Sequence, residues 1–423
     1  MTSYRLCANL LFAATVSVLL VAPSARAQQA QVSDVMTKAV MVRDSLPPAD
    51  GSLWRFEGPS GIQHGLHTGL GLDPFSGRIN EVAIDPRNPL IMYATGATGG
   101  VWKTVDSGTT WTPRSAGFPI QSATAVALDP SSPSNVYVGT GDYKRADHSE
   151  PFSVGVMRSR DGGLTWKGSP VGKDPMRDYT VSRIVVDPVH KIVLAATGRG
   201  SKLPGGDIFR SSDDGITWVN AGLPDANWDD LELCDGATFW AAASQQKQLI
   251  DNPAGGGSGL LYRSTDGVQW KKIDLQAGHF NLDTQSPLKT YVACGAAKGS
   301  VFVGATNDAG DDVRVLQSND AGANWTTVAL VATGGGPFAR SALAATQNFI
   351  FFGGTGLWKL KLSDTIRSFT PVSGVPSDIQ CIVPDPTASD AVFVCDDKGI
   401  YRFDANTGDL KSLNSTLGVT QVW

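Results

Sequence analysis

The stretch SRDGGLTW, residues 159–166, decides the fold because close copies of it recur along the chain. The other copies are TVDSGTTW (104–111), SSDDGITW (211–218), SNDAGANW (318–325) and a shortened STDGVQW (264–270). A catalytic centre needs one set of reacting groups, whereas an element that returns about every 50 residues is typical of a repeated structural unit. The motif therefore indicates a repeat protein.

A longer unit surrounds each copy of the motif. It consists of a short apolar strand, an Asp-Pro turn, a second apolar strand ending in Thr-Gly, a variable loop, a third strand, the motif, and a fourth strand led by Trp. Gly and Pro punctuation without helical periodicity favours an all-β array. Strands such as VAID, VALD and IVVD are apolar on both faces and must be covered on both sides, as in the radially stacked sheets of a propeller. The units span residues 79–111, 123–166, 182–218, 230–273, 291–328, 341–369 and 378–413.

We therefore predict an all-β propeller of seven blades, the last two of which lack the motif. Eight blades are the alternative, because the closing residues STLGVTQVW (415–423) read like the start of another first strand. The segment LWRFEGP (53–59) reads as a stray fourth strand that would close the ring against the last blade.

The amino terminus has the features of a secretory signal peptide. An apolar run follows Arg5 and ends before the small-residue site at Ala25 and Ala27, which predicts cleavage after residue 27. Residues 28–52 would form a lead segment and residues 53–423 a single propeller domain. No later stretch approaches the ~18 apolar residues of a membrane span, so we expect a secreted or periplasmic protein.

Charge and cysteine content bear on three properties: nucleic-acid binding, disulfide pairing and metal binding. The formal net charge is −5 and no basic cluster is present, which argues against a nucleic-acid partner. Beyond the signal peptide lie Cys234, Cys294, Cys381 and Cys395, whose pairing the sequence leaves open; Cys381 with Cys395 is favoured because they fall on adjacent strands. No zinc-binding motif occurs, so we expect neither a metal nor another cofactor.

The motif aspartates have a physical role in the hairpin between the third and fourth strands. An Asp there accepts hydrogen bonds from turn N–H groups, Gly supplies positive φ, and Trp packs between blades. We therefore interpret five aspartates as structural rather than catalytic. They are Asp106, Asp161, Asp213, Asp266 and Asp320.

With these features the chain resembles the Asp-box (BNR repeat) propeller superfamily, which includes sialidases, two-propeller xyloglucan-degrading glycosidases, sortilin-type receptors and the photosystem II assembly propeller. The segments VYVGTG (136–141) and VGVMRSRDGGLTW (154–166) are similar to secreted bacterial propellers of this kind. The resemblance covers about residues 53–413. It implies the fold and leaves the activity open, since one fold hosts many functions.

The catalytic signatures of that superfamily are missing. Sialidases carry an Arg-Ile-Pro motif at the start of the ring, whereas here Arg78 and Ile79 are followed by Asn80. The xyloglucan-degrading enzymes place an acid after the second strand of their first blade, and here that position reads ATGATGG (94–100). The absence of both signatures therefore favours binding over catalysis.

The variable loops should all lie on one face of the ring, the top face, where binding residues on a rigid scaffold usually lie. The richest loop is DYKRADHSEPF (142–152). It is either a recognition loop or an ordinary solvated loop. Its candidate binding residues are Asp142, Tyr143, Asp147, His148 and Glu150.

A second candidate site lies at the channel. Glu81, Arg183 and Asp230 occupy equivalent positions at the top end of three first strands. Glu81 and Asp230 would serve a glycosidase if their carboxylates lay ~5 to ~9.5 Å apart. Alternatively, the three residues form a structural ion cluster. Trp228 on the same face is either a platform for a sugar ring or core packing.

The sequence thus favours a secreted recognition module that binds a polysaccharide or a secreted or cell-surface protein through its top face. The alternative is a glycoside hydrolase that uses Glu81 and Asp230.

Overall fold

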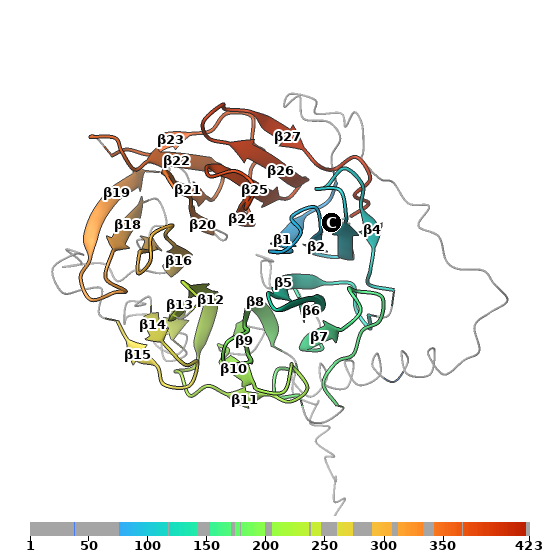
Figure 1. The fold of residues 1–423 in the computed structure, drawn as a ribbon. Coiled ribbons are helices and arrows are strands. Elements are labelled where there is room, and N and C mark those ends of the chain that lie inside the picture. Colours follow the sequence, from blue (N-terminus) through green and yellow to red (C-terminus); the bar gives the residue numbers. More distant parts are fainter. Residues whose placement is uncertain are drawn as a thin grey trace, which may run out of the picture.

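The computed structural model describes Lys38 and residues 76–116, 118–142, 153–170, 174–177, 179–198, 205–236, 238–246, 260–273, 290–306, 312–332, 342–365 and 367–419. Seven antiparallel sheets stand around a central axis like the blades of a propeller (Figure 1). The prediction of seven blades is confirmed, and no eighth sheet forms among the described residues. Within that part of the chain no helix has the length and hydrophobicity needed to cross a membrane.

Each blade runs from an innermost first strand to an outermost last strand. Blade 2 has three named strands, and a single bridge between Arg158 and Lys167 marks the place of its fourth. In order, the blades comprise β1 (Ile79–Ile84), β2 (Met92–Gly96), β3 (Gly100–Thr104), β4 (Thr112–Pro113); β5 (Ala123–Asp129), β6 (Ser132–Thr140), β7 (Val156–Ser159); β8 (Thr180–Asp187), β9 (Ile192–Gly198), β10 (Ile208–Ser211), β11 (Val219–Asn220); β12 (Ala226–Cys234), β13 (Thr238–Gln246), β14 (Leu260–Ser264), β15 (Lys271–Lys272); β16 (Thr290–Cys294), β17 (Val301–Thr306), β18 (Asp312–Ser318), β19 (Thr326–Ala332); β20 (Ala342–Ala345), β21 (Phe349–Gly353), β22 (Leu357–Lys361), β23 (Thr370–Pro371); and β24 (Cys381–Pro384), β25 (Ala391–Asp396), β26 (Gly399–Asp404), β27 (Leu410–Ser412).

The core is divided among the interfaces between blades. Strand β9 is buried along its whole length, which is the pattern expected of a strand covered on both faces. Its side chains alternate in direction: Leu194 packs against blade 4, and Val193 and Ala195 pack against blade 2. Seven hydrophobic clusters fill the seven interfaces in this way. The apolar runs in the sequence therefore reflect a sheet with neighbours on both sides.

The motif hairpins have the geometry that their sequence predicts. Asp161 accepts hydrogen bonds from the backbone N–H groups of Leu164 (3.0 Å) and Thr165 (2.9 Å) and from the hydroxyl of Ser159 (2.7 Å). The φ of Gly163 is 88°, which glycine adopts without steric cost. Trp166 stands edge-on to Phe118 of the preceding segment, with ring centroids 5.0 Å apart. Each hairpin is thus held by its Asp and tied to the blade before it by its Trp.

The ring is closed by the segment that follows β27. Leu417 and Val419 pack in the cluster between blades 7 and 1, and the N–H of Gly77 donates to the carbonyl of Val419 (2.6 Å). The indole of Trp111 in blade 1 donates to the carbonyl of Leu413 (2.9 Å). This segment, read from the sequence as the possible start of an eighth blade, instead covers blade 1. The expected closing strand at residues 53–59 lies outside the described residues.

Two disulfides join the four cysteines. Cys381 and Cys395 face each other directly in the register of β24 and β25, with 5.0 Å between their Cα atoms. Cys234 at the end of β12 and Cys294 at the end of β16 link blade 4 to blade 5, with 5.2 Å between their Cα atoms. The pairing favoured from the sequence is confirmed, and the second bond fastens two neighbouring blades together.

Candidate functional site

A charged cluster lies where three innermost strands approach the axis of the ring. Glu81, Arg183 and Asp230 each follow a β-bulge at the same point of β1, β8 and β12. A bulge inserts one extra residue, bends the strand and re-aims the next side chain. The three residues, which occupy equivalent positions in the sequence repeat, therefore also have equivalent backbone geometry. As a result, their side chains meet.

Arg183 is the centre of this cluster. Its guanidinium is ion-paired with Glu81 of blade 1 and with Asp230 of blade 4, where Nε lies 3.0 Å from Oδ1. A third acid, Glu232, has its Oε1 atom 3.9 Å from Nη2 of Arg183. One side chain thus connects blades 1, 3 and 4 across the inner wall of the channel.

Glu81 and Asp230, the two acids predicted to serve a glycosidase, also accept hydrogen bonds from backbone amides. Glu81 accepts a hydrogen bond from the N–H of Val126 in β5 (3.0 Å), and Asp230 accepts one from the N–H of Val292 in β16 (3.0 Å). An innermost strand is an edge strand whose outward N–H groups lack a partner strand, so these carboxylates satisfy donors of the next blade. Both carboxylates are also almost fully buried, with 10% and 4% of the side chains accessible. This environment is that of a structural ion cluster.

Glu232 differs from its neighbours. It lies two residues after Asp230 on β12, and 34% of its side chain is accessible. Burial of the carboxyl, followed by the negative charge of Asp230, raises the pKa of Glu232 to about 8. At neutral pH this group is therefore mostly protonated and can donate a hydrogen bond or a proton.

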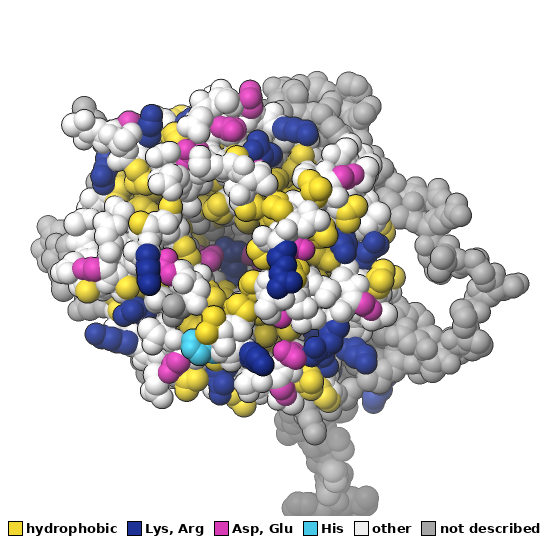
Figure 2. All heavy atoms as spheres, in the orientation of Figure 1, with side chains coloured by type: hydrophobic (Ala, Val, Ile, Leu, Met, Phe, Trp, Pro, Cys, Tyr) yellow, Lys and Arg dark blue, Asp and Glu magenta, His cyan; other side chains and the backbone are white. Residues whose placement is uncertain are grey.

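The pKa of Arg183 is shifted in the direction that keeps its charge. Burial by itself disfavours the cation, but Glu81, Asp230 and Glu232 outweigh that effect and raise the pKa of Arg183 above its usual value. The centre of the ring accordingly holds a permanent cation surrounded by acids. Figure 2 shows a hollow at the centre of the molecule, with basic and acidic side chains inside it.

Two of the predicted binding residues are buried in the structure. Trp228 is fully buried between blades 3 and 4 and stands edge-on to Tyr262, with ring centroids 5.8 Å apart, so it cannot stack on a sugar. Asp142 is 4% exposed and ion-paired with Arg78, which is itself fully buried. The expectation that Trp228 and Asp142 contact a ligand is therefore corrected: the first is core packing and the second belongs to a buried ion pair.

The remaining candidates in that loop, Tyr143, Asp147, His148 and Glu150, lie outside the described residues. Among the residues that the structure does describe, no group of three or more His, Cys, Asp or Glu side chains is arranged to hold a metal ion.

Glu232 was not among the predicted site residues, because it lies outside the position that Glu81, Arg183 and Asp230 share in blades 1, 3 and 4. The signal was available in the run DDLELCD (229–235), where Asp230 and Glu232 are two residues apart on a predicted strand and so share a face. Burial of Trp228 could not be read from the sequence, because it depends on the bulge between Trp228 and Asp230.

Comparison with known proteins identifies xyloglucanases among the relatives of this chain. No family model matches the sequence. Xyloglucanase Xgh74A of Acetivibrio thermocellus is 27% identical over 212 residues, which cover 44% of this chain and 24% of that protein. A xyloglucanase of a Paenibacillus species is 24% identical over 307 residues, covering 68% of this chain and 25% of that protein. The chain therefore spans about a quarter of the length of these curated relatives.

Solved structures with the same fold come from two kinds of protein. YCF48 bound to D1 peptide superposes with a TM-score of 0.52 at 17% identity, covering 85% of this chain and 99% of that chain. An ancestral GH74 enzyme superposes with a TM-score of 0.55 at 15% identity, covering 86% of this chain and 47% of that chain. At such identities the likeness shows the fold alone. The chain is a seven-bladed β-propeller, similar in sequence to part of the xyloglucanases.

Proposed function

We propose that this protein is a polysaccharide-binding propeller that recognises a xyloglucan-like glycan and does not cleave it. The observation that carries the proposal is the sequence similarity to xyloglucanases, which extends over 68% of the chain in one case. Binding is assigned to the face of the ring on which the repeat pattern predicts the variable loops, including the one that contains Tyr143 and His148. Aromatic and polar loop residues on a rigid scaffold are suited to sugars, whose rings stack on aromatic faces.

The environment of the central acids supports binding over hydrolysis. A glycosidase needs one carboxyl to give a proton and a second carboxylate to act as a nucleophile or base. Glu81 and Asp230 are each occupied by Arg183 and by a backbone amide. Changing the role of either acid would break the contacts that hold the inner strands.

The test measures binding and cleavage on the same protein. Xyloglucan should retard the protein in affinity electrophoresis, and Tyr143→Ala should weaken that retardation without changing the melting temperature. Tyr262→Phe, which alters a residue packed on buried Trp228, serves as the matched control and should bind normally. Release of reducing ends from xyloglucan by the unmodified protein would reject the non-catalytic proposal.

A second candidate function, glycoside hydrolysis, is favoured by one observation. Glu232 is partly accessible and protonated at neutral pH, as a general acid must be. If the protein cleaves a glycan, Glu232→Gln should abolish reducing-end release without lowering the melting temperature. Glu81→Gln should instead lower the melting temperature, because it disturbs the contact with Arg183.

We also propose that the protein is exported and loses residues 1–27. The two disulfides support this proposal, because such bonds persist mainly in oxidising compartments. Amino-terminal sequencing of protein recovered from the periplasm or medium should begin at Gln28. Recovery of the protein only inside the cell with an intact amino terminus would contradict it.

A further inference from the structure

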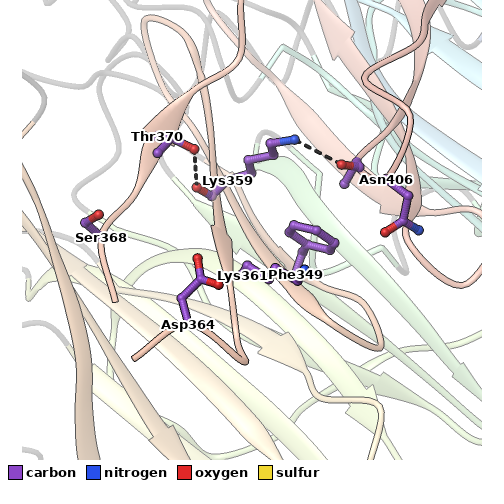
Figure 3. A pocket seen from close by; sticks show the side chains of 8 residues that line it. Phe349, Lys359, Lys361, Asp364, Ser368, Thr370 and Asn406 are labelled. Atoms are coloured by element: carbon purple, nitrogen blue, oxygen red, sulfur yellow. Dashed lines mark hydrogen bonds between the residues drawn. The ribbon is translucent and has the colours of Figure 1, made fainter. Parts of the chain in front are cut away.

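A polar pocket lies between blades 6 and 7, at the end of the blades that carries the hairpins between third and fourth strands. Its cavity volume is about 320 Å³, at the lower end of the roughly 300–1,000 Å³ typical of small-molecule sites. Lys359, Lys361, Asp364, Ser368 and Thr370 of blade 6 line it, together with Asn406 of blade 7 (Figure 3). The pocket is thus formed at the opposite end of the blades from the point where β6 ends and β7 begins.

A difference between blades explains why the pocket forms here. The strand registers give three residues equivalent positions: Trp111 of blade 1, Phe369 of blade 6 and Leu410 of blade 7. Each directly precedes a fourth-strand residue that pairs with the third strand. These pairs are Lys103–Thr112, Lys359–Thr370 and Arg402–Lys411. Blades 2 to 5 carry Trp at this position, so blade 7 is the one blade without an aromatic ring there. A smaller side chain fills less of the groove against the preceding blade.

Lys359 has a fixed ammonium group on the pocket wall. Its Nζ lies over the rings of Phe349 (5.6 Å) and Phe403 (5.3 Å) and donates to the carbonyl of Ala405 (3.0 Å). An ammonium has three N–H donors, and this carbonyl uses one of them. Lys361 is exposed on the same wall and adds a second ammonium. Two cations against the single carboxylate of Asp364 give the pocket a net positive charge.

The neutral side chains of the pocket present acceptors. Thr370 donates its hydroxyl proton to the carbonyl of Lys359 (3.2 Å), and Asn406 donates its amide to Asp390 (3.2 Å). The Thr370 oxygen and the Asn406 carbonyl therefore keep acceptor capacity on the pocket lining, together with the carboxylate of Asp364. Figure 3 shows Lys359 reaching toward blade 7, with Asp364 and Ser368 on the other side of the pocket.

We propose that this pocket binds a carboxylated monosaccharide, a uronate. The carboxylate of such a sugar would accept from Lys359 and Lys361, and its hydroxyl groups would donate to Asp364, Thr370 and Asn406. A simple inorganic anion would use the lysines and leave the acceptors unsatisfied, whereas a neutral sugar would leave the two cations without a counter-charge. The combination of donors and acceptors is what selects an acidic sugar.

Calorimetric titration of the full protein with glucuronate, glucose and sulfate tests this assignment. Glucuronate should bind at least about tenfold more tightly than glucose, which lacks the carboxylate, or sulfate, which has no hydrogen-bond donor at neutral pH. Lys361→Gln should weaken glucuronate binding about tenfold, and Lys272→Gln, an exposed lysine of blade 4, should leave it unchanged. Equal affinity for sulfate or glucose, an unaffected Lys361→Gln variant, or no saturable glucuronate binding would each overturn the proposal.

A second pair of variants guards against loss of folding. Lys359→Gln removes the fixed ammonium, and Lys103→Gln removes its counterpart in blade 1, which lies 5.1 Å over Tyr93 and donates to Gly162 (3.2 Å). Both substitutions should lower stability to a similar extent, but Lys359→Gln alone should abolish glucuronate binding. The site is independent of the proposed polysaccharide site, so Lys361→Gln should leave xyloglucan retardation unchanged.

Discussion

Asp161 and Glu232 are both carboxylic acids, and their surroundings shift their pKa values in opposite directions. Hydrogen bonds from the side chain and the N–H of Thr165 lower the pKa of Asp161 to about 2. Burial and the charge of Asp230 raise the pKa of Glu232 to about 8. The first group is stabilised by its contacts as an anion, whereas the second is forced toward its neutral form.

The contribution of a motif aspartate can be measured at Asp161. Asp161→Ala removes the acceptor for Leu164 and Thr165, whose amides lie at an exposed turn where water can replace it. We therefore expect a loss of about 1 kcal/mol in the free energy of unfolding, the typical net value of a hydrogen bond. Asp161→Asn, which keeps one acceptor oxygen, should lose less in urea denaturation. Loss of glycan binding by Asp161→Ala at unchanged stability would contradict the structural role.

Glu232 should make stability depend on pH in the neutral range. The unfolded chain ionises this group near its ordinary pKa of 4.5, whereas the folded protein holds the proton until about pH 8. The folded state therefore binds more protons between these values, and the stability contributed by this group falls as pH rises through that window. Glu232→Gln should flatten the decline and raise the melting temperature at pH 8 while changing little at pH 4. An equal decline in both proteins would refute the assignment.

At the scale of the element, the first strand of each blade combines burial with an edge that has no partner strand. Glu81 and Asp230 satisfy amides of the following blade, and Arg183 neutralises both acids. The bulge before each of these residues is what aims its side chain. Inner strands are thus held together by charge in the places where no partner strand exists.

Removal of Arg183 should therefore be costly. Arg183→Met leaves two buried carboxylates without a counter-charge, and breaking a buried ion pair in this way costs about 3–5 kcal/mol. Adding Glu81→Gln and Asp230→Asn to this variant removes the two carboxylate charges that lack a partner. Each new side chain still offers an acceptor for its backbone amide. The triple variant should recover most of the loss in chemical denaturation. If it is no more stable than Arg183→Met, the cluster does not act through its charges.

Local patterns predicted the elements well, and long-range contacts were predicted poorly. The apolar runs and the motif copies identified the seven blades, because alternation and turn chemistry act over a few residues. Glu81, Arg183 and Asp230 could be grouped because the repeat aligns them. The pairing of Arg78 with Asp142, and the burial of Trp228, depend on neighbouring blades and on a bulge, neither of which leaves a local signature.

At the scale of the whole molecule, seven similar interfaces hold the ring together, and a disulfide and the segment after β27 reinforce two of them. The disulfide between Cys234 and Cys294 joins blades 4 and 5. The segment ending at Val419 joins blades 7 and 1. The first is covalent, whereas the second rests on packing and hydrogen bonds.

The two disulfides should differ in their effect on stability. The bond from Cys234 to Cys294 closes a separation of 60 residues, and the bond from Cys381 to Cys395 closes one of 14. Loop-closure entropy predicts a loss of about 2–4 kcal/mol when a bond is removed, larger for the longer loop by about 1 kcal/mol. The two double Cys→Ala variants, compared by thermal denaturation, check this order. Alkylation of any of the four thiols without reductant would show that a bond is absent.

The packing of Val419 against blade 1, which closes the ring, can be tested by substituting Gly99. A Cβ atom at Gly99 would lie 2.7 Å from Cγ1 of Val419, so Gly99→Ala should overpack the seam and cost about 1–3 kcal/mol. Val419→Ala in the same protein makes room and should restore part of the loss. Additive effects of the two substitutions in a double-mutant cycle would mean that these residues do not touch.

The hydrogen bond between Gly77 and Val419 means that the order of the blades along this chain could be changed by circular permutation. Because the two ends of the ring lie side by side, a short linker could join them and new termini could be opened elsewhere, for instance in the exposed turn at Asp235 and Gly236. Such a circular permutant would keep all seven blade interfaces and would start in blade 4. The order in which the blades leave the ribosome would change, and the finished ring would not.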